Sequence, residues 1–272
     1  MTTESVDGNS GNLAPIISAR DLRVQYGESE ILHGISFDVQ PKETIVILGG
    51  SGSGKSTLLR TMVGLERPTS GAIWVYGTDL AQASAAELDD VRKKIGLSFQ
   101  GGALIGSMTV GENVALPLRE HTHLEDSTIE VMVRIKLQQV GLLNFRHFMP
   151  SQLSGGMKKR AALARAMAMD PEILFFDEPS AGLDPITAAG IDNLILNLKK
   201  ALSVTIVVVT HELASAFLIA DRIIVLDGGH IVGIAPTEEL KRSNHPRIQQ
   251  FLNRAPDTED GNDADHLLLL ID

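Results

Sequence analysis

The chain of 272 residues contains no cysteine, which excludes disulfides, thiolate metal sites and cysteine nucleophiles. The chain also has fewer positive than negative side chains, with 24 lysines and arginines and 34 aspartates and glutamates, which gives a formal net charge of −10. Non-specific binding to a nucleic acid backbone needs a basic face, so we expect no nucleic acid partner. Hydrophobic residues make up 43% of the chain, which allows a sizeable core in one large or two small domains.

No apolar run approaches the ~18 residues needed to span a bilayer, and 267–271 is far too short. Residues 1–14 are polar and lack the charged and apolar regions of a signal peptide, so we expect a disordered leader. Residues 255–272 are expected to form an acidic tail whose apolar end is either frayed or a docking peptide across a dimer. If the protein works at a membrane, another chain must hold it there.

One glycine-rich stretch fits the phosphate-binding pattern of a glycine, four residues and then Gly-Lys-Ser/Thr. Its glycines let backbone N–H groups point at phosphate oxygens, Lys55 supplies a mobile charge, and the Ser56 hydroxyl can bind Mg²⁺. An apolar strand is predicted before the stretch and a helix after it, which places the phosphates at a helix N-terminus. The predicted phosphate site comprises Gly49, Gly50, Ser51, Gly52, Ser53, Gly54, Lys55, Ser56 and Thr57.

Polar residues follow three further apolar segments, 95–99, 173–176 and 205–209, which we interpret as buried parallel strands. Gln100, Asp177 and His211 would therefore lie at the ligand-binding edge of the sheet. Ser56, Gln100 and Asp177 are the candidate Mg²⁺ ligands, Glu178 can polarise an attacking water, and His211 can reach a γ-phosphate. The alternative is that these are ordinary solvated residues at strand ends.

The remaining elements surround this predicted sheet. Residues 16–26 and 31–39 are expected to pair as an antiparallel hairpin, and Tyr26 at the end of its first strand is either a purine-stacking residue or an ordinary strand-end tyrosine. Further strands are expected at 72–76, 222–227 and 230–235. Further helices are expected at 85–93, 185–202, 238–242 and 247–253.

A helical insert is expected over 101–152, with helices at 110–118 and 129–140 bounded by Pro117 and Gly141. It closes at the sequence Leu-Ser-Gly-Gly-Met, residues 153–157, before a helix at 158–169. In that sequence Ser154 is a candidate N-cap, and Gly155 and Gly156 leave backbone N–H groups open to an anion. The chain thus contains two helix starts suited to phosphate.

Together these motifs resemble the nucleotide-binding subunit of an ABC transporter, and the resemblance covers residues 16–253. It implies an α/β P-loop NTPase of ABC type at 15–254, with a mainly parallel core sheet, an antiparallel β subdomain and an inserted helical subdomain at about 101–170. It also implies ATP hydrolysis with Mg²⁺. The implied elements are the adenine-stacking Tyr26, Walker A at 49–57, the Q-loop Gln100, the signature at 153–157, the Walker B pair Asp177 and Glu178, the D-loop at 180–184 and the switch histidine His211.

The resemblance further implies a head-to-tail dimer, in which Walker A of one chain and Ser154, Gly155 and Gly156 of the other enclose one ATP. Met157 stands where the family usually has glutamine, but the backbone donors are unaffected and we expect activity. The stretches 99–104, 114–122 and 161–166 resemble the MlaF-like branch. That branch energises phospholipid transport between Gram-negative membranes from the cytoplasmic face of the inner membrane.

The implied partners are an MlaE-like permease, an MlaD-like protein with an MCE domain and an MlaB-like STAS protein. We expect the permease to contact the helical insert, in a groove for which the candidate lining residues are Leu104, Met108, Val110 and Val114, some of which must belong to the core. The alternatives are an ABC importer of amino acids or another small solute, and a soluble ABC ATPase that transports nothing. A P-loop kinase would leave 153–157 unexplained.

Overall fold

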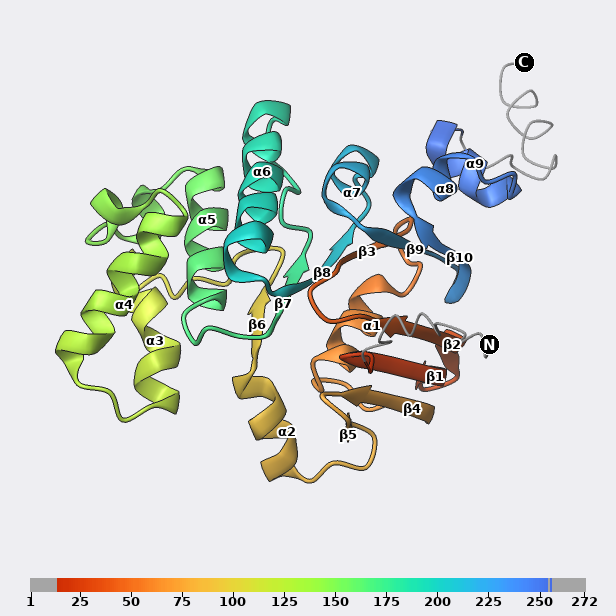
Figure 1. Ribbon diagram of the computed structural model, residues 1–272, viewed down its shortest axis with the longest axis horizontal. Helices are drawn as coiled ribbons and strands as arrows, with labels where there is room; N and C mark the ends of the chain where they lie inside the picture. Colours follow the sequence, from red (N-terminus) through yellow and green to blue (C-terminus); the bar gives the residue numbers. More distant parts are fainter. Residues whose placement is uncertain (1–13, 254, 256–272) are drawn as a thin grey trace, which may run out of the picture.

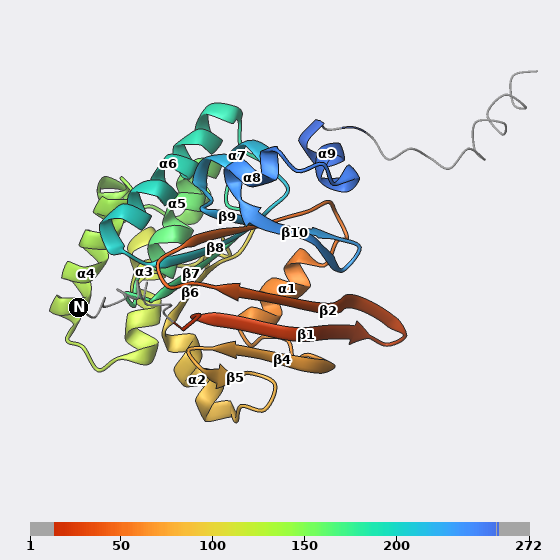
Figure 2. The same ribbon diagram turned by 45° about the vertical axis from the view of Figure 1, so that its right-hand side comes forward.

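The computed structural model describes residues 14–253 and residue 255 (Figures 1 and 2). Within that range the strands form a four-stranded sheet in the order β2-β1-β4-β5 and a six-stranded sheet in the order β10-β9-β3-β8-β7-β6. The predictions for residues 1–13 of the leader and 256–272 of the tail lie outside the described residues. None of the described helices combines the length and the apolar character needed to cross a membrane.

The four-stranded sheet is antiparallel throughout. The expected hairpin is confirmed, because Tyr26 pairs with Ser29 around a turn in which Gly27 has φ +59°. Strand β5 was not predicted, since two residues are too few to show a pattern. The strands are β1 (Ile17–Tyr26), β2 (Ser29–Val39), β4 (Ser70–Val75) and β5 (Thr78–Asp79).

The six-stranded sheet is mainly parallel, as predicted. Only β10 runs antiparallel to its neighbour, β9, across the tight turn at Gly228 and Gly229. The strands are β3 (Thr44–Leu48), β6 (Ile95–Ser98), β7 (Ile173–Asp177), β8 (Thr205–Thr210), β9 (Arg222–Asp227) and β10 (His230–Pro236).

Helices cover both faces of the six-stranded sheet (Figures 1 and 2). Helix α1 packs between this sheet and the four-stranded one, and α3, α4 and α5 gather at one side of the molecule. The helices are α1 (Lys55–Met62), α2 (Ala85–Lys93), α3 (Val110–His121), α4 (Asp126–Gln139), α5 (Gly155–Ala166), α6 (Pro185–Leu202), α7 (Leu213–Ile219), α8 (Thr237–Lys241) and α9 (Pro246–Asn253), with 3₁₀ turns at Leu143–Phe145 and Pro150–Gln152.

Two hydrophobic cores lie on opposite faces of the six-stranded sheet. Along β3, Val46 and Leu48 pack into the core shared with α3 to α7, whereas Ile45 and Ile47 pack into the core shared with α1 and the four-stranded sheet. Successive side chains of a strand point to opposite faces, so a strand between two cores is apolar at every position. This burial explains the continuous apolar runs of β3 and β8.

Several predictions of local structure were wrong. The segment 95–99 is not buried throughout, because β6 lies at the end of the described sheet and Phe99 is 41% exposed. Helix α3 continues through Pro117 to His121, since its buried face extends to Leu118 and hydrogen bonding resumes from Thr122 N–H to the Leu118 carbonyl at 3.0 Å. Helix α7 was missed.

The helix after the glycine pair begins at Gly155 and ends at Ala166, rather than spanning 158–169. Ser154 occupies the N-cap position as predicted, and its hydroxyl accepts a hydrogen bond from Met157 N–H at 3.3 Å. A capping side chain bonds a backbone N–H two or three residues on, so the helix must start directly after Ser154.

Candidate functional site

The carboxyl ends of four neighbouring strands meet at one edge of the six-stranded sheet. Leu48 of β3 pairs with Thr210 of β8, and Val209 of β8 pairs with Asp177 of β7. The next strand, β6, pairs Ser98 with Phe176. Gly49, Gln100, Glu178 and His211 each follow one of these strand ends, so the fold brings together residues that are up to 162 positions apart in the printed sequence.

The phosphate loop, residues 49–54, connects β3 to α1. Gly54 is the N-cap of α1 with φ +97°, and it offers no side chain to the free N–H groups of the first turn. Those N–H groups and the helix dipole favour an anion at this position. A Cβ atom on Gly49 would lie 2.2 Å from the Leu226 carbonyl oxygen, so the loop can follow this path only with glycine there.

Lys55 is the buried cation of the loop. Its Nζ donates to the carbonyl oxygens of Gly49 at 2.8 Å and Gly50 at 2.7 Å, which holds the ammonium under the loop. Burial lowers the pKa of Lys55, while the carboxylates of Glu178 and Asp177 act in the opposite direction. Of the other predicted loop residues, Ser53 and Thr57 are buried, Gly50 and Gly54 are half-buried, and Ser51, Gly52 and Ser56 are exposed.

Asp177 has a buried oxygen, Oδ1, that accepts no hydrogen bond from any residue the structure describes. Burial raises the pKa of this carboxyl, and the neighbouring Glu178 raises it further. An unpartnered buried carboxylate oxygen beside a phosphate loop suits a cation. The described residues contain no cluster of three or more His, Asp or Glu side chains that would hold a metal unaided. Mg²⁺ fits this pattern, because it is usually bound by one or two protein ligands together with substrate phosphates.

Glu178 is only 8% exposed, and its side chain is fixed at both oxygens. Thr210 Oγ1 donates to Oε2 at 3.2 Å, and His211 Nδ1 lies 2.8 Å from Oε1. The backbone of Glu178 has φ +49°, the left-handed region that a side chain rarely adopts. Such strain persists where the surroundings enforce it, and here Glu178 N–H donates to the Val209 carbonyl at 2.8 Å.

His211 and Gln100 are more exposed than Glu178. The His211 side chain is 53% exposed, and its Nε2 lies 3.6 Å from an oxygen of Glu212. Gln100 is exposed directly after β6, and its backbone carbonyl accepts a hydrogen bond from Lys159. Thr210 and Lys159 contribute contacts that the sequence analysis missed.

Tyr26 lies at the end of β1, outside the sheet edge just described. Its side chain is 43% exposed, and its hydroxyl donates to Glu66 Oε2 at 2.9 Å, shortly after α1 ends. The ring is thereby tied at its polar end to the segment that follows the phosphate loop and its helix. An exposed aromatic face held in this way is available for stacking.

The second predicted anion site, at the start of α5, belongs to another part of the molecule. Helix α5 packs on α3, α4, α6 and β6, whereas α1 packs on β2, β4, β7 and β8. Ser154 and Gly155 are exposed, and Gly156 is buried against α6, where an added Cβ atom would lie 2.5 Å from Thr187 Cγ2. Two separate helix starts suited to phosphate are therefore present in one chain.

Comparison with known proteins identifies the family. The family model described as "ABC transporter" matches residues 32–181, which is more than half of the chain. The chain belongs to the ABC transporter family. The motifs at 49–57, 153–157 and 177–178 resemble its Walker A, signature and Walker B sequences.

Relatives of known name support the same assignment. The chain is 42% identical over 237 residues to the probable ribonucleotide transport ATP-binding protein mkl of Mycobacterium leprae, covering 87% of this chain and 68% of that one. It is 41% identical over 246 residues to the intermembrane phospholipid transport system ATP-binding protein MlaF of Escherichia coli, covering 90% of this chain and 91% of that one.

A solved dimeric ATP-binding cassette in a post-hydrolysis state, bound to ADP and Pi, is 32% identical with a TM-score of 0.74. The match covers 81% of this chain and 98% of that chain. The predicted family and ABC-type α/β fold class are thereby confirmed, and with them the assignment of the chain as an ATPase that uses ATP.

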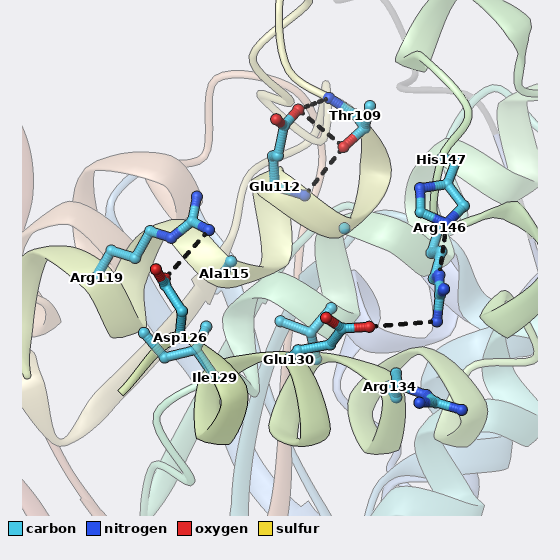
Figure 3. A pocket seen from close by; sticks show the side chains of 12 residues that line it. Thr109, Glu112, Ala115, Arg119, Asp126, Ile129, Glu130, Arg134, Arg146 and His147 are labelled. Carbon is cyan, nitrogen blue, oxygen red and sulfur yellow. Dashed lines mark hydrogen bonds and ion pairs between the residues drawn. The ribbon is translucent and has the colours of Figure 1, made fainter. Parts of the chain in front are cut away.

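In the present chain, a groove of about 460 Å³ lies between α3 and α4 (Figure 3). Both helices and the segment at 146–147 contribute charged side chains to it. Arg119 lies 3.6 Å from Asp126, and Arg146 lies 3.6 Å from Glu130. Of the four candidate residues for the permease groove, Val110 and Val114 are the ones that belong to the core, because they face inward from α3 and are fully buried. Leu104 and Met108 are half-buried.

Proposed function

We propose that this ABC ATPase is the motor subunit of a phospholipid transporter and hydrolyses ATP at the sheet edge described above. The observation that supports this most directly is the convergence of Lys55, Asp177 and Glu178 at that edge. Lys55 is placed for the β- and γ-phosphates, and the α1 N-terminus adds backbone donors. Tyr26 is the proposed adenine-stacking residue, and the exposure of its ring supports that role.

In the proposed mechanism Glu178 orients and polarises the attacking water, because it is the buried carboxylate at the strand end and both of its oxygens are fixed. His211 Nδ1 holds Glu178 Oε1, and the exposed His211 ring is placed to contact the γ-phosphate. Mg²⁺, held by Ser56, Gln100 and Asp177, would neutralise charge on the phosphates. The strongest support for this set of Mg²⁺ ligands is Asp177 Oδ1, a buried oxygen that accepts no hydrogen bond from any described residue.

The complete site is proposed to require a second copy of the chain. The Walker A loop and the signature helix belong to different parts of one chain, and a structural relative is a dimer bound to ADP and Pi. A head-to-tail pair would place Ser154, Gly155 and Gly156 of one copy over the γ-phosphate held by the other. Met157 in place of glutamine does not remove these backbone donors.

Phospholipid is the proposed cargo, moved between inner and outer membranes, because the MlaF proteins match this chain over nearly their whole length. The Mycobacterium leprae relative is similarly identical to this chain, but the match covers only 68% of that protein's length. We propose an MlaE-like permease as membrane partner, with MlaD-like and MlaB-like subunits, and attachment to the cytoplasmic face of the inner membrane.

The α3–α4 groove is the proposed contact with the permease. It is open, it lies on the helical segment between Gln100 and the signature, and its rim carries both signs of charge. Such a rim fits a short polar helix of a partner with complementary charges. This proposal replaces Val110 and Val114 of the predicted contact with the exposed charged residues of the groove.

The test is to purify the native complex from its membrane and to identify the permease and any lipid that co-purify. Reconstituted complex is then assayed for ATP-dependent transfer of labelled phospholipid between vesicles. Transfer that requires ATP and is lost with Lys55→Ala is expected. Co-purification with a permease that moves ribonucleotides, without phospholipid transfer, would replace the proposed cargo and leave the ATPase role intact.

A further inference from the structure

Lys159 contacts two parts of the ATP site from the signature helix. It lies on α5, four residues after Gly155, and is half-buried. Its Nζ donates to the backbone carbonyl of Gln100 and, at 2.9 Å, to the backbone carbonyl of Glu178. One ammonium therefore joins the residues that follow β6 and β7 to the helix whose N-terminus carries the signature.

Both acceptors lie where the chain leaves a strand of the six-stranded sheet, and the Glu178 carbonyl also accepts from Ala181 N–H at 3.3 Å. Glu178 has a left-handed backbone at φ +49°, and its carbonyl orientation follows from that conformation. Gln100 begins the loop that leaves the edge strand β6. An ammonium offers three donors to these carbonyls, and hydrogen bonds to a charged group are stronger than neutral ones. Burial lowers the pKa of Lys159, while the nearby Glu178 and Asp177 carboxylates favour its charged form.

A second cation of α5 provides a comparison. Arg165 donates to the carbonyls of Gly102 at 2.8 Å and Ala103 at 2.7 Å. It thus holds the same loop to the same helix. Only Lys159, of these two, also reaches Glu178.

We propose that Lys159 is a positioning residue that transmits the placement of the signature helix to Gln100 and Glu178 of the same chain. The inference rests on the proposed two-chain ATP site, in which α5 of one copy contacts the nucleotide on the other. A shift of α5 caused by that nucleotide moves the ammonium, and the ammonium moves the backbone of the water-activating glutamate. Lys159 thereby links the two ATP sites of the dimer through one chain.

The test uses the intact complex with Lys159→Met, which removes the charge at similar side-chain length, and Lys159→Arg, which restores donors. Steady-state hydrolysis is measured against ATP concentration. For Lys159→Met we expect kcat to fall roughly tenfold or more, within the ~10²-fold that a small misplacement can cost. We expect KM for ATP to stay close to wild type, and the Hill coefficient to fall toward about 1 as coupling between the sites is lost.

Three controls separate positioning from general damage. Lys159→Arg should recover most of kcat and cooperativity. Arg165→Met should leave the Hill coefficient near that of the wild type, because it loosens the loop without releasing Glu178. Added to Glu178→Gln, Lys159→Met should leave the ATP-held dimer intact. If Lys159→Met impairs folding, Lys159→Gln, which retains amide donors, is measured in its place with an intermediate loss expected.

Wild-type kcat and cooperativity in Lys159→Met would overturn the proposal. So would the same loss of cooperativity in Arg165→Met, since the loop contact alone would then explain it. A wild-type complex that hydrolyses no ATP would instead contradict the proposed function, so the two failures can be told apart.

Discussion

His211 and Glu178 face each other across the ends of β8 and β7, with His211 Nδ1 2.8 Å from Glu178 Oε1. The two side chains differ sharply in exposure, because the His211 side chain is 53% exposed and that of Glu178 only 10%. In the proposed mechanism the buried carboxylate acts on the attacking water, and the exposed imidazole that holds it contacts the γ-phosphate.

Glu178→Gln should bind ATP but hydrolyse it more slowly than the wild type by about 100-fold or more, because general base catalysis typically contributes at least that factor. The amide keeps the size of the side chain and can still accept from Thr210. ATP should then hold two copies together, which size-exclusion chromatography with ATP and Mg²⁺ detects as a dimer. Glu212→Gln is the matched control, since Glu212 is an exposed carboxylate 3.6 Å from the other side of His211.

Rapid hydrolysis by Glu178→Gln would assign the base elsewhere, and His211 is then the next candidate. The combination Glu178→Gln with His211→Ala decides between them. If His211 is the base, the second substitution removes the remaining turnover. If it only contacts phosphate, the substitution weakens the ATP-held dimer.

Lys55→Ala should abolish ATP hydrolysis while the fold is kept. The substitution removes the only side-chain cation within the 49–57 loop, along with its hydrogen bonds to the Gly49 and Gly50 carbonyls. The measurement is ATPase activity of the purified complex, with circular dichroism as the check on folding. Lys93→Ala on α2, where the lysine pairs with Asp90 at 3.3 Å on the surface, is the control expected to retain wild-type activity.

The elements that could be predicted from the sequence are those whose pattern is local. Strand β3 is apolar at every position after Thr44 and ends at a glycine loop, so both its burial and its place before the phosphate site could be predicted. Ser154 could be predicted as an N-cap because that signal needs only Ser154 itself and the two glycines that follow it. The family resemblance then predicted that these motifs meet at one edge of the sheet.

The contacts that were missed depend on tertiary packing. Nothing in the local sequence of α5 indicates that Lys159 reaches the Gln100 and Glu178 carbonyls, which lie 59 and 19 positions away. Pro117 suggested a helix end, but the apolar face of α3 is buried on both sides of it. Phe99 looked like a core residue because apolar content cannot distinguish an edge strand from a central one.

Asp177→Asn should make the protein more resistant to heat at neutral pH. The native pKa of Asp177 is raised above its unfolded value, near 3.8, by burial and by Glu178. At a pH between the unfolded and the native pKa of Asp177, the native state binds more protons than the unfolded state. The contribution of Asp177 to stability therefore falls as the pH rises from the unfolded pKa through the native one. Asparagine is neutral, so the variant avoids the free-energy cost of burying a charged carboxylate. Thermal unfolding without nucleotide should therefore show a higher Tm for the variant at pH 7, with the difference shrinking as pH approaches 4.

Asp184 provides a control of opposite sign for this experiment. Its pKa is lowered, first by the hydrogen bond from the Thr187 side chain and then by backbone donors at the start of α6. Its contribution to stability is therefore present above the unfolded pKa and is lost as pH falls through the native one. Asp184→Ala should lower the Tm at neutral pH. A lower Tm for Asp177→Asn as well would show that Asp177 is stabilised rather than strained by its surroundings.

Charge reversal in the α3–α4 groove should uncouple transport from hydrolysis. Arg119→Glu reverses an exposed charge, so it should change the free energy of unfolding by no more than about 0.5 kcal/mol. Arg146→Glu reverses the charge of a half-buried side chain, which is 32% exposed, and should cost more. A residue that anchors an interface typically contributes about 2 kcal/mol or more, which corresponds to roughly a 30-fold loss of affinity for the permease. The measurements are binding to the permease, transport and basal ATPase, with Lys93→Glu on α2 as the control.

Unchanged permease binding in both groove variants would place the contact elsewhere. Loss of folding would show that the ion pairs with Asp126 and Glu130 are structural. The exchange Arg119→Asp with Asp126→Arg separates these outcomes, because it rebuilds the pair with the charges transposed. It should restore stability and leave permease binding impaired.

The two glycines of the signature should respond differently to alanine. A Cβ atom on Gly155 would lie 3.3 Å from Leu183 Cδ2, a contact that a small shift relieves, whereas on Gly156 it would lie 2.5 Å from Thr187 Cγ2. Thr187 cannot rotate away freely, since its Oγ1 donates to Asp184 Oδ2 at 2.6 Å. Gly156→Ala must therefore break that bond or displace α5 from α6, and overpacking of this kind costs about 1–3 kcal/mol.

We expect Gly156→Ala to lower the Tm by roughly 2–4 °C for each kcal/mol lost, and to weaken the ATP-held dimer of Glu178→Gln by moving the signature. Gly155→Ala should unfold near the wild-type temperature, because alanine is favoured over glycine by up to about 1 kcal/mol within a helix. The decisive variant is Gly156→Ala with Thr187→Ser, which removes Cγ2 but keeps the hydroxyl for Asp184. Recovery of both Tm and dimer in this double variant assigns the glycine to the close approach of α6. Equal defects with and without Thr187→Ser would instead assign it to the nucleotide face of α5.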